Sequence, residues 1–503
     1  MNYDGGGMGC WMELNSMKDS LMRRIERYAS LTIPRICLPE GFDLLNTDQT
    51  HDYQSAGAQC VNNLTNKIML ALFRPSAPFF RVQLDREMRK ALADKGLDED
   101  AMAPALALME RDAAKELDAR AQRPKLYQAV RHIIVAGNVL LCLHKEGMRV
   151  LGLHYFCVKR DQLGRVMTLV IKECIKFNEL EQKVQASLAG RYHKDTKVEH
   201  YKLITRNEKG DYELRQFVNG DDLGADFQSK WPEDRLPYRV ITWDLADEAD
   251  YGTGLVEEYA GDLEALSTLS EAVVDGAVLG CEYRWLIKPT GQTSVEDFKG
   301  SENGDALPGN PEDIAPTQGG NPTAITVASN VLEKYERRVA SGFLMFSGVT
   351  RNAERVTAEE VRLTANELET AYGGVYSSLG NMLQGPVAYW LLDANGTSIE
   401  GTNLKIVVLT GLDALSRNSD LENLRLALQD MAEIENLPEG FKIRVNWDAV
   451  ADYVGQGRGV NLRKFLLSEK ELQAKAAQGT QQRVQEASAT AAGEAAAQGA
   501  IQQ

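Results

Sequence analysis

The sequence predicts an α+β fold in which helices come first, an antiparallel sheet follows and a long helical section comes last. Up to about residue 135, apolar residues recur at helical spacing, whereas residues 153–243 alternate between apolar and polar and are divided by Gly, Asn and Asp. Beyond residue 254 the pattern indicates a helix, a compact Gly- and Pro-rich excursion, a second helix, a loop and a further long helix.

The N-terminal part predicts three helices and a strand. Apolar stripes at helical spacing predict helices at 14–31 and 52–73, each followed by prolines that end it. A charged helical stretch is expected at 85–121. Residues 127–135 then lead into AGNVLLCLHKEG, which predicts a buried strand and a turn.

Alternating residues predict antiparallel strands that are joined by hairpins. The turns RDQLGR and NEKGDY carry the Gly, Asn and Asp residues that such connections favour. The expected strands are 153–159, 165–174, 198–205, 212–218 and 238–243.

Two helices with a small excursion between them follow the sheet. The first is expected at 256–279 and the second at 324–340. Between Leu245 and Glu282 there are ten carboxylates and not one lysine or arginine. The excursion at 281–321 is too small to fold alone, and short strands are expected within it at 283–287 and 295–298.

A capping box marks the start of the next long helix. Thr357 is followed three residues later by Glu360, so the hydroxyl and the carboxylate can each accept from the other residue's backbone N–H. The helix is therefore expected to begin at about Ala358. Gly373 and Gly374 lie inside its apolar pattern and predict a bend or a close backbone contact.

The C-terminal part predicts alternating helix and strand and then a tail that lacks core residues. The expected elements are a helix closing at 386–392, a strand at 403–411, a helix at 419–433, a strand at 441–447 and mixed turn and helix at 460–476. From about residue 477 the apolar content is nearly all alanine, so the tail cannot pack a core.

Composition excludes several classes of protein. The net charge of −16 argues against a surface that grips nucleic acid all over, although it does not exclude a protein that lets DNA pass. Seven scattered cysteines without a CxxC pair favour free thiols in a reducing compartment. The N-terminus lacks the pattern of a signal peptide, and the most apolar segment, 133–143, is far too short to span a bilayer, so we expect a soluble cytoplasmic protein.

Motifs for catalysis and for metals are weak. We find no phosphate-binding loop, dinucleotide fingerprint, HExxH or GxSxG, so no catalytic residues and no cofactor are predicted. One metal-like constellation combines Cys142, His144, His154 and Cys157, but Cys-x-His is not the usual close pair of a structural zinc site. We interpret these four as alternating strand residues and predict no metal.

The stretch ERVTAEEVR, with ELE and GGVYSSL after it, resembles the segment that follows the tunnel loop in the portal, or head-to-tail connector, proteins of short-tailed bacteriophages. The order of neighbouring motifs agrees along most of the chain, from about Asp52 to about Ala476. The resemblance implies a portal-type protomer with an α/β wing, a two-helix stem, a small clip, a tunnel loop followed by a long helix, and a mainly helical crown.

The resemblance also implies domain boundaries. These are a wing at 1–254, a first stem helix at 255–280, a clip at 281–321, a second stem helix at 322–342, a tunnel loop at 343–356, a long wing helix and strand at 357–418, a crown at 419–476 and the tail at 477–503.

Candidate site residues follow from composition and from the resemblance. Thr357 and Glu360 would fix the root of the loop. The residues expected to meet DNA in the channel or the tunnel loop are Phe343, Phe346, Ser347, Arg351, Arg355, Arg337 and Arg338. The alternative for the arginines is pairing between subunits or at helix ends, for example with Glu336 or Glu354.

The first stem helix and the clip supply further candidates. The acidic face of the helix comprises Glu257, Glu258, Asp262, Glu264, Glu271 and Asp275. These carboxylates could repel DNA from a channel wall, or they could form a solvated outer face beside other copies. The clip residues proposed for docking are Tyr283, Arg284, Trp285 and Lys288, although Trp285 could instead form the small core of the clip.

As a family member, the chain would form a ring, expected to be a dodecamer, at one capsid vertex of the virion. Double-stranded DNA would pass through it without sequence specificity during genome packaging and ejection. Terminase and later tail adaptors would dock on the clip, scaffold and capsid proteins on the wing, and internal core proteins on the crown; assembly would occur in the host cytoplasm without a membrane. The alternative is a helical ring or scaffold-like assembly protein without a DNA channel.

Overall fold

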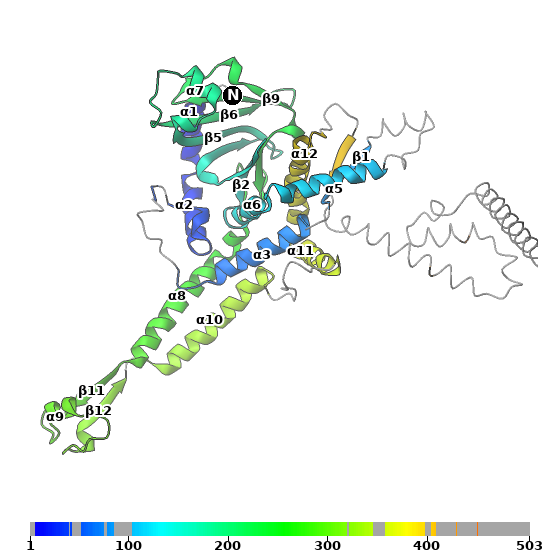
Figure 1. Cartoon of the computed structure of the whole chain (residues 1–503). Helices are drawn as coiled ribbons and strands as arrows, with labels where there is room; N and C mark the ends of the chain where they lie inside the picture. The colour runs from blue at the N-terminus through cyan, green and yellow to red at the C-terminus, as the bar shows by residue number, and fades with distance from the viewer. Residues whose placement is uncertain are drawn as a thin grey trace, which may run out of the picture. The chain divides into compact units, whose positions relative to one another are not determined.

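The computed structural model describes residues 6–39, 41–42, 52–74, 78–84, 103–318, 321–345, 358–397 and 404–408, with the single positions Gln429 and Val450 (Figure 1). At 84, 103–104, 283, 318 and 358–362 only the backbone is described. The chain divides into two units, Met1–Gly411 and Leu412–Gln503. All strands and complete helices described below lie in the first unit, so the expected helix at 419–433, the strand at 441–447 and the tail lie outside the described residues.

Helices and antiparallel sheets make up the first unit, which confirms the predicted α+β class. The N-terminal helices are α1 Gly6–Met17, α2 Asp19–Ser30, α3 Ala56–Leu72, α5 Ala103–Ala119 and α6 Arg123–Ala136.

The prediction of one helix at 14–31 is wrong, because the chain turns at Lys18 between α1 and α2. The side chain of Lys18 is buried, and its ammonium donates to the carbonyls of Leu153 (2.6 Å) and Phe156 (2.9 Å). A buried ammonium needs such acceptors, and they lie 135 residues or more away in sequence. The turn therefore depends on a tertiary contact that helical spacing does not report.

The largest sheet confirms the predicted hairpins. Its strands are all antiparallel and run in the order β4 Phe156–Arg160, β5 Val166–Lys176, β6 Lys197–Arg206, β7 Tyr212–Val218 and β8 Asp221–Asp222, with β9 Ser229–Trp231 also paired to β7. The short helix α7 Gln182–Ser187 lies between β5 and β6 in the sequence. Helix α1 covers one face of this sheet, where Trp11 packs with Tyr201 and Phe217 in a separate apolar cluster.

A second sheet holds the strand predicted from AGNVLLCLHKEG. It runs in the order β10 Tyr238–Thr242, β2 Asn138–His144 and β3 Gly147–Leu151, and six of the seven residues of β2 are buried. Helix α6 leads into β2 through Gly137, whose φ of 70° ends the helix in the left-handed region. The main core forms around α3, α6, β2 and α12.

Two long helices, α8 Leu255–Cys281 and α10 Pro322–Gly342, lie side by side and carry a small hairpin at their far end (Figure 1). The hairpin pairs β11 Tyr283–Ile287 with β12 Ile314–Gln318. The expected strand at 295–298 is wrong: these residues begin helix α9 Val295–Gly300, which is capped by the hydroxyl of Ser294. Asn321 and Pro322 start α10 in the expected way, since the Asn321 side chain accepts from two backbone N–H groups.

The long helix α11 Ala358–Leu379 bends at Gly373, whose φ is 43° and ψ is −115°, which confirms the predicted bend. A π-helical turn Gly380–Gln384 then leads into α12 Gly385–Ala394. The turn brings the buried Gln384 amide to the terminal carbonyl of α3 at Leu72. Strand β13 Leu404–Val408 pairs with β1 Phe80–Leu84, which ties the end of the unit back to its beginning.

None of the helices in the described part of the chain is both long and apolar enough to cross a bilayer.

Two buried histidines predict that stability falls in mild acid. Burial lowers the pKa of His132 and of His200 to about 4, from an ordinary value near 6.5. Between these pH values the unfolded chain binds more protons, so stability is complete above about pH 6.5 and is lost progressively toward pH 4. For each histidine the loss is on the order of 3 kcal/mol.

The measurement is thermal or urea unfolding from pH 7 to pH 4. His132→Gln should reduce the slope of unfolding free energy against pH by about 1.4 kcal/mol per pH unit, because one titrating group is removed. His193→Gln, at an exposed position, is the control. Equal slopes for the wild type and His132→Gln would contradict the assignment.

Candidate functional site

The C-terminal end of α10, where the expected loop begins, is closed by a defined hydrogen-bond motif. Leu344 lies in the left-handed region, with φ of 57°. The N–H of Met345 donates to Ala340 O (2.8 Å), and the N–H of Leu344 donates to Ser341 O (3.1 Å). These are the two bonds of a Schellman motif, although that left-handed position usually holds glycine. The chain therefore leaves the helix along a fixed path.

Side chains from α3 and α11 bind the carbonyls beyond this motif. The amide of Asn63 donates to Phe343 O and Leu344 O (both 3.2 Å), and the ammonium of Lys67 donates to Leu344 O (2.7 Å). From α11, the hydroxyl of Tyr372 donates to Gly342 O (2.6 Å). We call Asn63, Lys67 and Tyr372 the loop-root clamp.

The clamp is partly buried and charged. Lys67 is 7% exposed and forms an ion pair with Glu367 of α11 at 3.0 Å. Burial is the main cause that raises the pKa of Tyr372, which keeps its hydroxyl protonated as a donor. Because unpaired buried carbonyls are costly, these contacts stabilise one geometry where α3, α10 and α11 meet.

The structure moves the start of the loop. Phe343 was expected among the loop residues, but its side chain is 1% exposed and packs on Tyr259 of α8, with ring centroids 5.3 Å apart. Phe343 thus belongs to the core in this chain. The expected loop residues Phe346, Ser347, Arg351 and Arg355 lie outside the described residues, as does Thr357. Glu360 is described only by its backbone, so the capping box stays a prediction.

A cleft of about 370 Å³ borders the loop root. It is lined by residues of α8, α10 and α11, among them Glu258, Tyr259, Gly342 and Tyr372. Gly342 allows α10 and α8 to approach closely here, because a Cβ atom at this position would overlap the ring of Tyr259.

The acidic face of α8 is partly neutralised within the chain. Glu257 pairs with Arg24 of α2 at 2.9 Å, and Glu264 pairs with Arg27 of the same helix. Farther along, Glu271 accepts a hydrogen bond from Tyr53, which raises the pKa of that tyrosine.

The remaining carboxylates of the expected acidic face of α8 have other surroundings. Asp262 pairs with Arg338 of α10 at 3.3 Å, whereas Glu258 lines the cleft. Asp275 is exposed near Tyr53. The expected acidic face is therefore an internally paired section near α2 followed by an exposed distal section.

Arg337 and Arg338 on α10 are exposed but paired. Arg337 pairs with Glu333 one turn earlier at 2.5 Å, and the guanidinium of Arg338 also lies over the ring of Tyr335 at 4.7 Å. The alternative of helix-end pairing gave Glu336 and Glu354 as example partners; the carboxylates paired with these arginines are Glu333 and Asp262, and Glu354 lies outside the described residues. Both arginines are more than half exposed, which leaves their guanidinium groups accessible to a further partner.

The distal halves of α8 and α10 pack against each other, but no residue in them is fully buried. Both helices are described along their whole length; the buried residues of α8 all precede Ser267, and those of α10 are Val339 and Ala340 at its end. Several apolar side chains are about half exposed on these halves: Val274, Val278, Leu279 and Val327.

The clip hairpin exposes an aromatic and basic surface. Trp285 packs edge-on against Phe298 of α9, with centroids 5.5 Å apart, yet it is 52% exposed. It therefore contributes to the small core of the hairpin and also presents surface. Arg284 and Lys288 are exposed, whereas only the backbone of Tyr283 is described.

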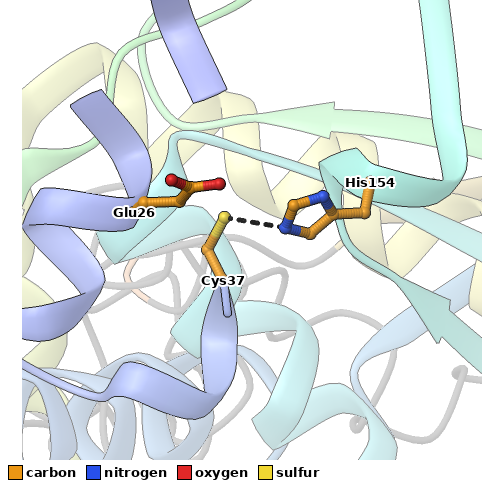
Figure 2. A group of neighbouring side chains, drawn as sticks. All are labelled: Glu26, Cys37 and His154. Atoms are coloured by element: carbon orange, nitrogen blue, oxygen red, sulfur yellow. Dashed lines mark hydrogen bonds between the residues drawn. The ribbon is translucent and has the colours of Figure 1, made fainter. Parts of the chain in front are cut away.

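Among the described residues, the four members of the expected metal-like constellation are not brought together as one group of ligands. Cys142 lies in β2, and the ring of His144 packs edge-on against Tyr238. His154 instead contacts Cys37 at 3.3 Å, with Glu26 beside them (Figure 2).

The loop-root clamp was missed at the level of sequence. Its one signal is Lys67 within NKIMLALF, a lysine that falls among the buried residues Leu64, Ile68 and Leu72 of α3. A charged residue on a buried face requires a specific partner. The identity of that partner could not be deduced, because Leu344 and Glu367 lie 277 and 300 residues away.

Comparisons with known proteins agree along nearly the whole chain. The profile of a family described as "Bacteriophage head to tail connecting protein" matches residues 9–466. The portal protein of Enterobacteria phage SP6 is 32% identical over 477 residues, which cover 94% of this chain and 92% of that protein. The portal protein of Pseudomonas phage phiKMV is 34% identical over 463 residues (90% and 89%), and that of Escherichia phage T7 is 30% identical over 498 residues (95% and 91%).

Among solved structures, the neck of an empty GTA particle aligns with a TM-score of 0.36 and 13% identity, covering 79% of this chain and 89% of that chain. A similarity this low supports no conclusion about function.

Lys67→Met tests the clamp. The change removes the donor to Leu344 O and the ion pair with Glu367, so we expect a loss of about 1–3 kcal/mol in unfolding free energy. Urea unfolding followed by circular dichroism measures it. The exposed Lys115, paired with Asp112 on α5, provides the control Lys115→Met, which should change stability by less than about 0.5 kcal/mol.

A double-mutant cycle with Glu367→Gln separates the pair from simple loss of packing. The double variant should lose less than the sum of the single variants, because each single change already disrupts the same contact. Strict additivity would contradict a coupled clamp.

Proposed function

The chain belongs to the bacteriophage head to tail connecting protein family and is a portal component of the capsid vertex, and we propose that its copies close into a ring, expected to be a dodecamer. The observation that carries the ring is that the distal halves of α8 and α10 contain no fully buried residue and leave several apolar side chains about half exposed. Long helices are marginal in water when they bury no apolar face. Neighbouring copies around a closed ring would supply the missing cover.

We propose that α8 and α10 form the stem of this ring and that double-stranded DNA passes inside it without sequence specificity. The carboxylates Glu271 and Asp275 lie on the exposed distal part of α8. Negative charge facing DNA would keep the polymer from binding tightly to the wall, which a conduit requires.

We propose that the loop beginning after the clamp extends toward the DNA. Phe346, Ser347, Arg351 and Arg355 would provide an apolar tip and transient phosphate contacts. The rigid loop root supports this role, because a reaching segment needs a fixed base. Arg337 and Arg338 would contribute weaker contacts, since each is already paired with a carboxylate.

We propose that the clip hairpin is the docking surface for terminase during packaging and for tail adaptors afterwards. Half-exposed Trp285 with Arg284 and Lys288 beside it has the composition of a protein interface. Capsid and scaffold proteins would contact the wing and internal core proteins the crown. The protein would hydrolyse nothing itself, because the separate terminase supplies the work, and assembly would take place in the host cytoplasm.

Val278→Glu tests the stem interface. The change places a charge where we expect apolar contact between copies, so closed rings should become rare while the chain still folds. Negative-stain images and sedimentation under several salt conditions measure ring formation. Leu163→Glu, at an exposed hairpin tip, is the control. If Val278→Glu formed normal rings, the proposed stem interface would be contradicted. If the wild type never formed rings, the proposed ring would be contradicted.

The conduit role is tested by replacing Phe346 and Arg351 together with glycine. Rings should form normally, whereas the DNA packaged or retained per particle should fall several-fold. The matched control replaces the exposed wing residues Leu163 and Lys209 with glycine. Unchanged packaging and retention would contradict the loop assignment, and a ring that packages no DNA even as wild type would favour an assembly protein without a channel.

A further inference from the structure

Three side chains from distant parts of the chain meet beside α2. Glu26 lies on α2, Cys37 directly follows the 3₁₀ turn Pro34–Ile36, and His154 lies in the 3₁₀ turn Leu153–Tyr155. One ligand atom from each lies within 4.8 Å of the others, and Cys37 Sγ is 3.3 Å from His154 Nε2 (Figure 2). Among the described residues, these are the His, Cys, Asp or Glu side chains that gather at least three ligand atoms close enough to hold a metal ion.

The backbone around the group is closely packed. Gly152, just before the His154 turn, lies against the ring of His132 and the carbonyl of Ile36. The carbonyls of Leu153 and Phe156, on either side of His154, are held by the buried ammonium of Lys18. The two turns are thereby packed together, so Cys37 and His154 are positioned before any cation arrives.

The ligand set has a definite chemical preference. A thiolate, an imidazole and a carboxylate together suit zinc, which binds such ligands at about 2.0–2.3 Å in tetrahedral geometry. Ligand atoms around such an ion lie roughly 3.5 Å apart, which follows from those bond lengths. The Cys37–His154 distance of 3.3 Å already matches, and the Glu26 carboxylate, within 4.8 Å of both ligand atoms, would move closer to occupy a third position. Glu26 and His154 are half-buried, so a water could take the fourth.

We propose that Glu26, Cys37 and His154 form a binding site for one zinc-type divalent cation, which ties α2 to the sheet region. This inference goes beyond the portal role and does not depend on it. It also revises the expectation of no metal, which considered His154 with Cys142, His144 and Cys157. The correct partners could not be deduced from spacing, because Cys37 and His154 are 117 residues apart.

Zn²⁺ binding would release one proton from the site to solvent. Burial, with the Glu26 carboxylate, raises the pKa of the Cys37 thiol to about 12, so the thiol holds its proton at neutral pH. Zn²⁺ would displace that proton to solvent as the Zn–S bond forms. The Lys18 ammonium is close enough to lower the same pKa and would offset part of the negative charge of thiolate and carboxylate. No oxidant or reductant is required.

The alternative is that Cys37 and His154 form only a structural hydrogen bond. In that case Zn²⁺ at micromolar concentration would bind no more tightly to the wild type than to a variant without the thiol. The two possibilities therefore differ in the number of Zn²⁺ ions that each chain binds.

The experiment uses the purified full-length chain, stripped with a chelator and titrated with Zn²⁺ alone by calorimetry. We expect one Zn²⁺ per chain for the wild type and at least a tenfold weaker affinity for Cys37→Ser and for His154→Gln. Cys142→Ser is the matched control, since Cys142 is equally buried and burial also raises its pKa to about 12.

Two further readouts separate metal ligation from a folding defect. Co²⁺ in place of Zn²⁺ should give a thiolate-to-cobalt charge-transfer band that is absent in Cys37→Ser. Zn²⁺ should also raise the thermal midpoint of the wild type and of Cys142→Ser, but not of His154→Gln, whose half-exposed position tolerates the change. A wild type that binds no Zn²⁺, or ligand variants that keep the wild-type affinity and the cobalt band, would overturn the proposal.

Discussion

The end of α10 is the constraint on which the first unit depends. A long helix returns from the clip and must finish where its last carbonyls face the core. The left-handed Leu344 closes the helix, and Asn63, Lys67 and Tyr372 satisfy the carbonyls that follow. Those donors come from α3 and α11, so one cluster fixes three helices that are far apart in sequence. The residues expected to form the tunnel loop therefore follow a fixed end of α10.

The base of α8 is likewise held by contacts with distant parts of the chain. Ion pairs as well as buried apolar residues fix it there. Glu257 and Glu264 pair with arginines of α2, and Asp262 pairs with Arg338 of α10. Exposed pairs of this kind add little stability individually, but they fix the direction in which the helix leaves the body. Beyond Leu266 the described ion pairs of α8 with arginines end, although Ser267 and Glu271 still bond to Asp52 and Tyr53, and apolar side chains farther along are exposed. These pairs thus fix the direction of α8, and in the proposed ring neighbouring copies would cover its outer half.

Local patterns predicted the elements well, and contacts between distant residues account for what they missed. The hairpins, both stem helices and the bend at Gly373 follow from turn residues, helical spacing and glycine, which act over a few residues. The break at Lys18, the strand partner of β11 and the burial of Phe343 each depend on a partner elsewhere in the fold. Phe343 shows the difficulty most clearly: an aromatic residue after a helix and before a Gly- and Ser-containing segment has the composition of a loop tip. Only the ring of Tyr259, 84 positions earlier, places it in the core.

Pairing within the chain also changes how the acidic helix should act on DNA. If all six candidate carboxylates faced a channel, the repulsion would begin at the body and extend along the whole stem. Instead, three of the four nearest the body, Glu257, Asp262 and Glu264, are paired with arginines, and opposite charges in close contact present little net field at a distance. Screening at physiological salt reduces the remainder further, over about 8 Å. Among the six candidates, the carboxylates without a described arginine partner are Glu258, which lines the cleft, and Glu271 and Asp275, on the distal part of α8 toward the hairpin. If DNA passes along α8 as proposed, it would meet the carboxylates Glu271 and Asp275 near the hairpin and a more neutral wall near the body, so repulsion along the stem would be uneven.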